Sequence, residues 1–441
     1  MDVRSQEFIA RSNDGMADPS LQKTLGVFRN FAPTVRKNAV NNLDDFEGLR
    51  QWTKEAKNKT LENLSEHLAT FEKNVLSSGG QVHWAQTPED ANAIIVEICR
   101  EKNAKNIAKG KSMISEEIAL NDTLRKNNFN PIETDLGEYI IQLANEPPSH
   151  IIGPAIHKTF EQVVDLFKKH HNLGERDLGS VKAVMKEARG ILRDKFLSAD
   201  VGISGANYLI AETGTIGLVT NEGNADLVST LPKTHIVLTS IEKVVPDFKT
   251  AMAIQRLLVP SATAQPITCY TTFFTGPKKP EDIDGPEEFH VVLLDNKRSE
   301  ILHSEHKDIL RCIRCSACLN HCPIYTRTGG HAYGWVYPGP MGSVWSPLLK
   351  GLEETHDLPN ACTTCGRCEE VCPMDIPLPD MLRNLRREEQ QKGLQPKRWV
   401  FGMKLFMTFL RYPKLFQFFS KWGIRFLHST GKRKGYFAMY I

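Results

Sequence analysis

Apolar residues recur at helical spacing through the first part of the chain. Between Asp44 and Ser77 they stand three or four positions apart among charged residues, as Leu61, Leu64, Leu68, Phe71 and Val75. The pattern stops at Gly79-Gly80, and glycine commonly follows the end of a helix. Residues 1–80 are therefore predicted to form a helical segment that packs on the domain after it.

Short apolar runs mark strands in the next part of the chain. The clearest are His235–Thr239 and His290–Leu294, and Gln81–Ala85 is also typical of a short strand. Helical patterns lie between such runs: 91–102 is a helix candidate, 132–143 is typical of strand, turn and helix, and 149–190 is predicted to be helical and basic. This alternation predicts an α/β domain, a sheet layered with helices, over residues 81–297.

A glycine-containing turn between two β-rich runs is a candidate ligand site. It lies within Ala199–Thr220 and consists of Glu212, Thr213, Gly214 and Thr215. Backbone N–H groups of such a turn can approach an anion. Lys111 and Ser112, which precede a helix predicted to begin with Ser115 as its N-cap, extend this candidate anion site. A tight turn between packed strands and an ordinary charged turn are the alternatives.

Motifs for nucleotide phosphates are absent from the sequence. Neither G-x-G-x-x-G nor G-x4-G-K-S/T occurs, which excludes a Rossmann fingerprint and a Walker loop. His235 stands in an apolar run, so a buried histidine with satisfied hydrogen bonds is favoured over a ligand. Cys99, in another apolar stretch, is predicted to be a small buried residue.

Eight of the ten cysteines form two copies of one spacing, C-x2-C-x2-C-x3-C-P. This is the run of bacterial ferredoxins that carry two 4Fe–4S clusters, in which the fourth cysteine of each run ligates the other cluster. The spacing predicts two 4Fe–4S clusters. The expected ligands are Cys312, Cys315, Cys318 and Cys372 for one cluster, and Cys322, Cys362, Cys365 and Cys368 for the other.

Disulfides and structural zinc explain this spacing poorly. Disulfides need an oxidising compartment, and the first residues lack the apolar run of a secretory signal. Structural zinc uses C-x2-C pairs, which do not account for a third cysteine, a fourth cysteine and a proline in two copies. Electron transfer is therefore the first hypothesis for function.

The cysteine runs belong to a predicted ferredoxin-like domain over residues 298–393. Thirty-nine residues separate the runs, and within them Tyr333–Gly342 is rich in glycine, proline and aromatic residues, which predicts an ordered loop. Leu378–Gln391 is predicted to be the helix that leaves the second run. Two hypotheses remain for Arg314 and Arg367, which either stabilise a reduced cluster or are merely solvated.

The net charge of +3 conceals an uneven distribution. From Gln390 to Ile441 there are eleven Lys and Arg and no Asp or Glu. Residues 394–441 are predicted to form a basic amphipathic helical tail, broken at Pro413 and Gly423, that lies on an anionic membrane, docks on a partner or packs on its own domain. The near-neutral remainder argues against nucleic acid as a partner. A cytoplasmic location is expected, with the inner face of the membrane as a peripheral alternative.

The chain resembles the lactate-utilisation protein B family of iron–sulfur subunits. The likeness rests on Lys111-Ser112-Met113 with Glu116-Glu117, on Ala211–Ile216, on Cys362–Cys368 and on Pro338-Gly339-Pro340. It implies a LUD-type domain similar to the CoA-transferase and ribose-phosphate-isomerase fold. It also implies two partners, a second iron–sulfur subunit and another LUD-domain protein, in a system that oxidises L-lactate to pyruvate.

Two functional hypotheses follow. The first is an iron–sulfur electron-transfer subunit of a lactate-oxidising complex, with a quinone-linked acceptor at the membrane. The alternative is a metabolite-binding regulatory protein whose clusters report redox state. The sequence contains no flavin motif and no evident His/Arg pair for a 2-hydroxy acid. We therefore favour a subunit that relays electrons, while the oxidation of lactate needs the partner proteins.

Overall fold

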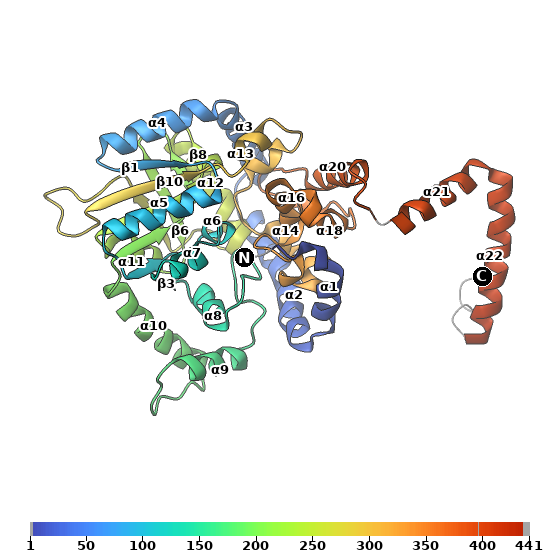
Figure 1. Cartoon of the computed structure of the whole chain (residues 1–441), viewed down its shortest axis with the longest axis horizontal. Helices are drawn as coiled ribbons and strands as arrows, with labels where there is room; N and C mark the ends of the chain where they lie inside the picture. The colour runs from blue at the N-terminus through green and yellow to red at the C-terminus, as the bar shows by residue number, and fades with distance from the viewer. Residues whose placement is uncertain (1–2, 396, 435–441) are drawn as a thin grey trace. The chain divides into compact units, whose positions relative to one another are not determined.

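Six parallel strands form the central sheet of the computed structural model (Figure 1). Their order across the sheet is β1 (Gln81–Ala85), β10 (Glu288–Leu294), β7 (Thr234–Ser240), β4 (Val201–Ser204), β2 (Asn106–Lys109) and β3 (Asn130–Glu133). The three predicted strands at 81–85, 235–239 and 290–294 are confirmed by position: β1 covers 81–85, β7 covers 234–240 and β10 covers 288–294. The strand order reverses between β2 and β4, because β3 lies on one side of β2 and the later strands lie on the other.

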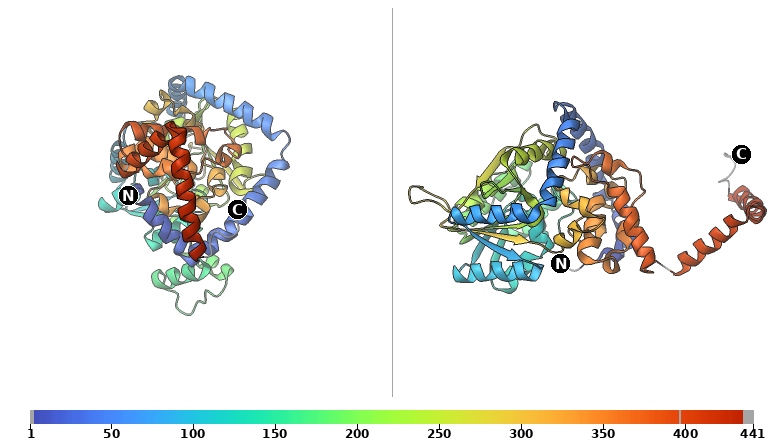
Figure 2. Two further views of the ribbon diagram at one scale, coloured as in Figure 1. Left: turned by 90° about the vertical axis from the view of Figure 1, so that its right-hand side faces the viewer. Right: turned by 90° about the horizontal axis from the view of Figure 1, so that it is seen from above.

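The structure describes residues 3–395 and 397–434. They fall into two compact units, one ending at Arg386 and the other beginning at Arg387. Figure 2 shows the layers of the first unit from two further directions.

Alternate residues of the strands face two different cores. Ile236 and Leu238 pack with helices α5 (Pro88–Glu101), α6 (Met113–Glu117) and α7 (Leu120–Lys126), whereas Val237 between them packs on the opposite face. On that opposite face, α4 (Leu64–Ser77) and a second sheet cover β7 and β10. Helices α8 (Leu136–Ala144), α9 (Phe160–His170) and α10 (Val181–Leu197) lie on the same face beside β2 and β3. The predicted α/β layering is confirmed.

Two local predictions for this domain need correction. The segment 149–190 is not continuously helical, since residues between Asn145 and Thr159 and between His171 and Ser180 are irregular. Helix α6 begins one turn earlier than expected, with Ser112 rather than Ser115 as its N-cap; the Ser112 hydroxyl accepts from the Ser115 amide at 3.4 Å.

The second sheet is small and mixed. Its strands are β8 (Val244–Val245), β5 (Tyr208–Ile210), β6 (Thr215–Thr220) and β9 (Tyr270–Phe274), in that order. Strands β5 and β6 form the antiparallel hairpin whose turn carries Gly214. Helices α11 (Asn224–Thr230) and α12 (Phe248–Thr263) follow β6 and β8 in the chain.

The N-terminal segment is helical, as predicted. It contains η1 (Ser5–Glu7), α1 (Phe8–Ala17), α2 (Pro19–Asn41), α3 (Phe46–Glu62) and α4 (Leu64–Ser77). The apolar stripe of α4, Leu64, Leu68, Phe71 and Val75, is buried against β7, β10 and the second sheet. Helix α2 also contacts α15 (Tyr325–Thr328) of the cysteine region, so the N-terminal segment contacts both parts of the first unit.

Short helices surround the two cysteine runs. They are α13 (Arg298–Leu302), η3 (Lys307–Arg311), α14 (Ala317–Asn320), α15 (Tyr325–Thr328), η4 (His331–Tyr333), α16 (Gly339–Lys350), α17 (Leu352–Thr355), α18 (Asp357–Asn360), α19 (Arg367–Glu370) and α20 (Leu378–Gln391). The prediction for α20 is confirmed. The prediction of a loop to Gly342 is wrong at its end, because α16 begins at Gly339 with Pro340 in its first turn, where proline is tolerated.

The second unit contains two further helices, α21 (Lys397–Arg411) and α22 (Pro413–Lys434). The predicted break at Pro413 is confirmed. The predicted break at Gly423 is wrong, because α22 continues through it; a glycine inside a helix costs only about 1 kcal/mol. The helices contact each other through ring pairs, Phe409 and Phe419 among them, with centroids 5.2 Å apart. Among the described residues, no helix is long and apolar enough to cross a membrane.

Candidate functional site

The two cysteine loops adopt the same backbone conformation. The residue before the second cysteine is left-handed in both, with φ of 60° at Arg314 and 55° at Thr364. The residue after the second cysteine is also left-handed, with φ of 63° at Ser316 and 78° at Gly366. The sequence repeat is therefore a structural repeat, although only one of these four positions carries the glycine that favours such angles.

The fold brings the eight cysteines together in two groups of four. Cys312, Cys315, Cys318 and Cys372 line one small cavity. In the other group, Cys362 and Cys365 act electrostatically on both Cys322 and Cys368. Each group combines three cysteines of one run with the last cysteine of the other run.

Backbone amides point at several of the sulfurs. The Thr364 amide donates to Cys362 Sγ at 3.3 Å. The Ala317 amide donates to Cys315, and the amides of Ile324 and Tyr325 donate to Cys322. Hydrogen bonds of this kind stabilise thiolate charge and help to set the potential of an iron–sulfur cluster.

The chemistry of the donor set fits 4Fe–4S clusters. Burial raises the pKa of Cys315 to about 12 and of Cys322 to about 11, so these thiols resist ionisation in the protein alone. Iron binds thiolates, and its binding releases the protons and stabilises the buried charge. Two groups of four cysteines match the four thiolates that each cubane cluster needs.

Buried arginines hold the chain around Cys372. Arg50 donates to the Cys372 carbonyl at 2.8 Å, and Arg36 donates to the Val371 carbonyl at 2.6 Å. Arg311 donates to the Met374 and Asp375 carbonyls. Sequence reasoning missed these arginines, because Arg36 and Arg50 lie more than 300 residues from the loop that they contact.

The two arginines of the cysteine loops occupy different environments. Arg367 is exposed and pairs with Glu370 at 2.6 Å, so for it the solvated alternative holds. The Arg314 guanidinium stacks on Trp345 at 4.4 Å and lies 5.1 Å from the ring of Tyr337. It also lies 3.5 Å from Glu242, and the negative charge of Cys312 raises its pKa despite burial.

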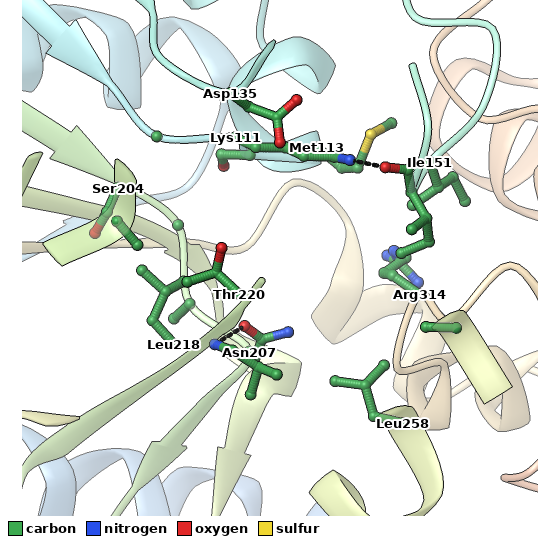
Figure 3. A pocket seen from close by; sticks show the side chains of 18 of the residues that line it. Lys111, Met113, Asp135, Ile151, Ser204, Asn207, Leu218, Thr220, Leu258 and Arg314 are labelled. Atoms are coloured by element: carbon green, nitrogen blue, oxygen red, sulfur yellow. Dashed lines mark hydrogen bonds between the residues drawn. The ribbon is translucent and has the colours of Figure 1, made fainter. Parts of the chain in front are cut away.

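A cavity of about 330 Å³ adjoins the first cysteine group (Figure 3). Residues at the carboxyl ends of four adjacent parallel strands line it: Lys111 and Ser112 after β2, Asp135 after β3, Ser204 and Asn207 at and after β4, and Ser240 and Lys243 at and after β7. Ile313, Arg314 and Tyr337 close it from the cysteine region. Lys111 Nζ donates to the Ile152 carbonyl, and Asp135 caps α8 by accepting from the amides of Gly137 and Glu138.

The structure separates the members of the predicted anion site. Lys111 and Ser112 line the cavity, but Glu212, Thr213, Gly214 and Thr215 lie at the hairpin turn between β5 and β6. There the Glu212 carboxylate accepts from the Phe248 amide at 2.9 Å, at the start of α12. Thr213 donates to Thr215 at 2.8 Å, and Gly214 packs against the backbone of α4 with φ of 69°.

The burial predicted for His235 and Cys99 is confirmed, but the prediction that the hydrogen bonds of His235 are satisfied is wrong for Nδ1, which has no hydrogen-bond partner among the described residues. His235 is completely buried, and its Nε2 lies 2.8 Å from Ser204 Oγ. Burial lowers the pKa of His235 to about 3, so the ring is neutral. Cys99 is completely buried, and burial raises its pKa to about 12.

Comparison with known proteins identifies the family. The LUD domain model matches residues 68–294, and the 4Fe-4S dicluster domain model matches residues 308–376. Lactate utilization protein B of Bacillus subtilis (strain 168) is 42% identical over 96% of this chain and 88% of its own length. The chain belongs to the lactate utilization protein B family. Its cofactors are 4Fe–4S clusters.

Other relatives extend this picture. Lactate utilization protein B of Bacillus licheniformis is 42% identical over 96% of this chain and 89% of its own length. The uncharacterized electron transport protein YkgF of Escherichia coli (strain K12) is 41% identical over 93% of this chain and 86% of its own length. A DUF162 family protein from Deinococcus radiodurans, a solved structure, shares 13% identity over 52% of this chain and 98% of its own, with a TM-score of 0.29, which supports no conclusion about the fold.

Proposed function

We propose that the protein is the iron–sulfur electron-transfer subunit of a multi-protein system that oxidises L-lactate to pyruvate. The grouping of the eight cysteines carries this proposal. Cys312, Cys315, Cys318 and Cys372 hold one cluster, and Cys322, Cys362, Cys365 and Cys368 hold the other. When bound, each cluster accepts and releases single electrons.

The chain's own residues prepare the environment of those clusters. The amides of Ala317 and Thr364 donate to cysteine sulfurs, which stabilises the electron-rich state. Arg314 places a buried positive charge beside Cys312, an environment that favours reduction of the first cluster. The exposed Arg367 has little such effect, because water screens its charge.

Partners complete the system in this proposal. They are a second iron–sulfur subunit and another LUD-domain protein, each contributing chemistry that this chain does not show. The α/β domain over 81–297 is of the CoA-transferase and ribose-phosphate-isomerase type, the ferredoxin-like domain covers 298–393, and the basic tail covers 394–441. The cytoplasmic complex meets a quinone-linked acceptor at the inner face of the membrane, and the tail provides the attachment.

The cavity at the carboxyl ends of the strands favours a second candidate function. A metabolite-binding regulatory protein also needs a pocket beside its clusters, and Arg314 contributes to both features. Under this alternative the clusters sense redox state, and lactate oxidation proceeds without the protein.

Growth on L-lactate distinguishes the two. A strain that lacks this gene and has no other lactate dehydrogenase is expected not to grow on L-lactate but to grow normally on pyruvate. Full-length protein restores growth, whereas Cys318→Ser does not. Normal growth of the deletion strain on L-lactate would reject the electron-transfer function.

A further inference from the structure

The cavity of about 330 Å³ occupies the place in the fold where α/β proteins bind ligands. Its walls follow β2 and β4, the two strands between which the strand order reverses. In open α/β sheets, ligands bind outside the carboxyl ends of strands at such a reversal. Its volume also falls within the range of small-molecule sites.

One buried donor at this cavity lacks a partner among the described residues. Arg314 Nη1 makes no hydrogen bond to any of them, although the Arg314 side chain is only 10% exposed. The rings of Trp345 and Tyr337 hold the guanidinium, and its other terminal nitrogen, Nη2, lies 3.5 Å from Glu242. Leaving a buried charged donor unpaired is costly, so the position indicates an acceptor supplied by a ligand.

The charged side chains that line the cavity favour a ligand with one negative charge. Lys111, Lys243 and Arg314 are cationic, against the acidic residues Asp135 and Glu222. The Asp135 carboxylate already caps α8, and burial beside Asp135 raises the pKa of Glu222. Apolar side chains also line the cavity, among them Leu218, Leu258, Val259 and Ala262. Such a site fits a small ligand with one anionic group and an uncharged carbon skeleton.

We propose that this cavity binds a small organic monocarboxylate, whose carboxylate accepts from Arg314 and Lys243. An arginine is suited to carboxylates because its planar fork matches their two oxygens. This inference rests on the proposed function and deepens it, because it identifies the class of substrate or product that meets this subunit.

The proposed site and the first cluster share a wall. Ile151, Ile313 and Arg314 line both the large cavity and the small one formed by the first cysteine group. Arg314 lies in the chain between Cys312 and Cys315. A carboxylate on Arg314 partly neutralises a buried positive charge beside Cys312, so ligand binding changes the electronic environment of the first cluster.

Binding is tested on full-length protein with both clusters in place, under anaerobic conditions. Isothermal titration with L-lactate, pyruvate and inorganic phosphate measures affinity, and the electron paramagnetic resonance spectrum of the reduced protein reports on the clusters. Saturable binding of L-lactate or pyruvate is expected, with a change in the signal that Cys318→Ser removes. Arg314→Gln weakens binding at least about tenfold, as expected for one lost charged hydrogen bond. Arg367→Gln, the matched change in the other loop, leaves binding unchanged.

A second variant keeps the test decisive if Arg314→Gln loses iron. Ala262→Phe fills the cavity from α12, away from the cysteines, and is expected to abolish binding with full iron content. Absence of saturable carboxylate binding, unchanged binding in Ala262→Phe, or tighter binding of phosphate than of either carboxylate would each overturn the inference. Loss of binding alone leaves the lactate-dependent growth test intact, so the two proposals fail separately.

Discussion

Arg298 and Glu117 form an ion pair in which both side chains are completely buried, with 2.9 Å between Arg298 Nη2 and Glu117 Oε2. Glu117 ends α6 of the α/β domain, and Arg298 begins α13, which leads to the first cysteine run. Tyr337 donates to Glu117 at 2.6 Å, and Glu242 lies 2.8 Å from Arg298 Nε. Each buried charge in this network is compensated by the others. The network also links the α/β domain to the cysteine region.

Removal of the central cation is expected to destabilise the protein strongly. Arg298→Met leaves Glu117 and Glu242 buried without their main counter-charge, which costs about 3–5 kcal/mol of the free energy of unfolding. Urea unfolding of the anaerobic protein with its clusters measures the loss. The matched control is Arg100→Met, which breaks an exposed pair with Glu97 and costs less than about 1 kcal/mol. Equal losses for the two variants would contradict the structural role of the buried network.

Iron content tests the cysteine groups. The anaerobic protein is expected to contain about eight iron and eight sulfide ions per chain, four of each per cluster. Cys318→Ser and Cys368→Ser belong to different groups, so each lowers the iron content by about half and the double variant lowers it to near zero. Cys99→Ser is the control, because Cys99 lies in the core of the α/β domain. Zinc in place of iron after anaerobic reconstitution would rule out the clusters.

Acid is expected to destabilise the α/β domain partly through His235. The pKa of this buried ring is lowered from 6.5 to about 3, so below pH 6.5 the unfolded chain binds a proton that the folded chain does not. The free energy of unfolding therefore falls by about 1.4 kcal/mol per pH unit from this residue as pH drops from 6.5 toward 3. In His235→Gln, the free energy of unfolding is expected to fall less steeply between pH 6 and 5, by about 1.4 kcal/mol per pH unit. Urea unfolding at each pH measures this difference. An unchanged slope would show that His235 does not titrate in this way.

The tail is expected to attach the protein to anionic surfaces. Lys404, Arg411, Lys414, Lys421 and Arg425 repeat at intervals of seven, three, seven and four, and each contributes about 1 kcal/mol near an anionic membrane. A chain ending at Gly393 keeps both clusters and loses sedimentation with phosphatidylserine-containing vesicles. Replacing the five cations with glutamine gives the same loss in the full-length chain, and high salt weakens wild-type binding. Vesicle binding that survives both changes would contradict this role.

Much of the fold follows from local sequence patterns. The apolar runs at 235–239 and 290–294 predict β7 and β10, because residues buried on both faces of a parallel sheet are almost all apolar. The strand pattern at 81–85 is also confirmed, as β1, although this strand lies at the end of the sheet and only Ala85 in it is buried. The cysteine spacing predicts the 4Fe–4S clusters, because ligands of one loop lie close in sequence. The predicted helix break at Gly423 is wrong, because the free-energy cost of one glycine inside a helix is smaller than the stabilisation that the rest of α22 provides.

The cavity illustrates what local patterns cannot predict. Its cations Lys111, Lys243 and Arg314 come from three distant segments, and only the strand order brings them together. Lys111 and Ser112 were predicted as site residues, but the glycine turn at 212–215 belongs to a different part of the fold. In the sequence, the place of Arg314 between two cysteines indicates a role beside the cluster, but Arg367 lies in the equivalent run. Only the structure distinguishes them, because the rings of Trp345 and Tyr337 contact Arg314.

Reduction of the clusters by L-lactate tests the central claim most directly. Oxidation of one L-lactate to pyruvate releases two electrons, and two clusters accept one electron each. In the anaerobic complex with its partner subunits, L-lactate is predicted to produce the electron paramagnetic resonance signals of both clusters of this chain, and Cys318→Ser is predicted to remove one of them. Clusters that stay oxidised with L-lactate but are reduced by dithionite would contradict an electron-transfer role in lactate oxidation.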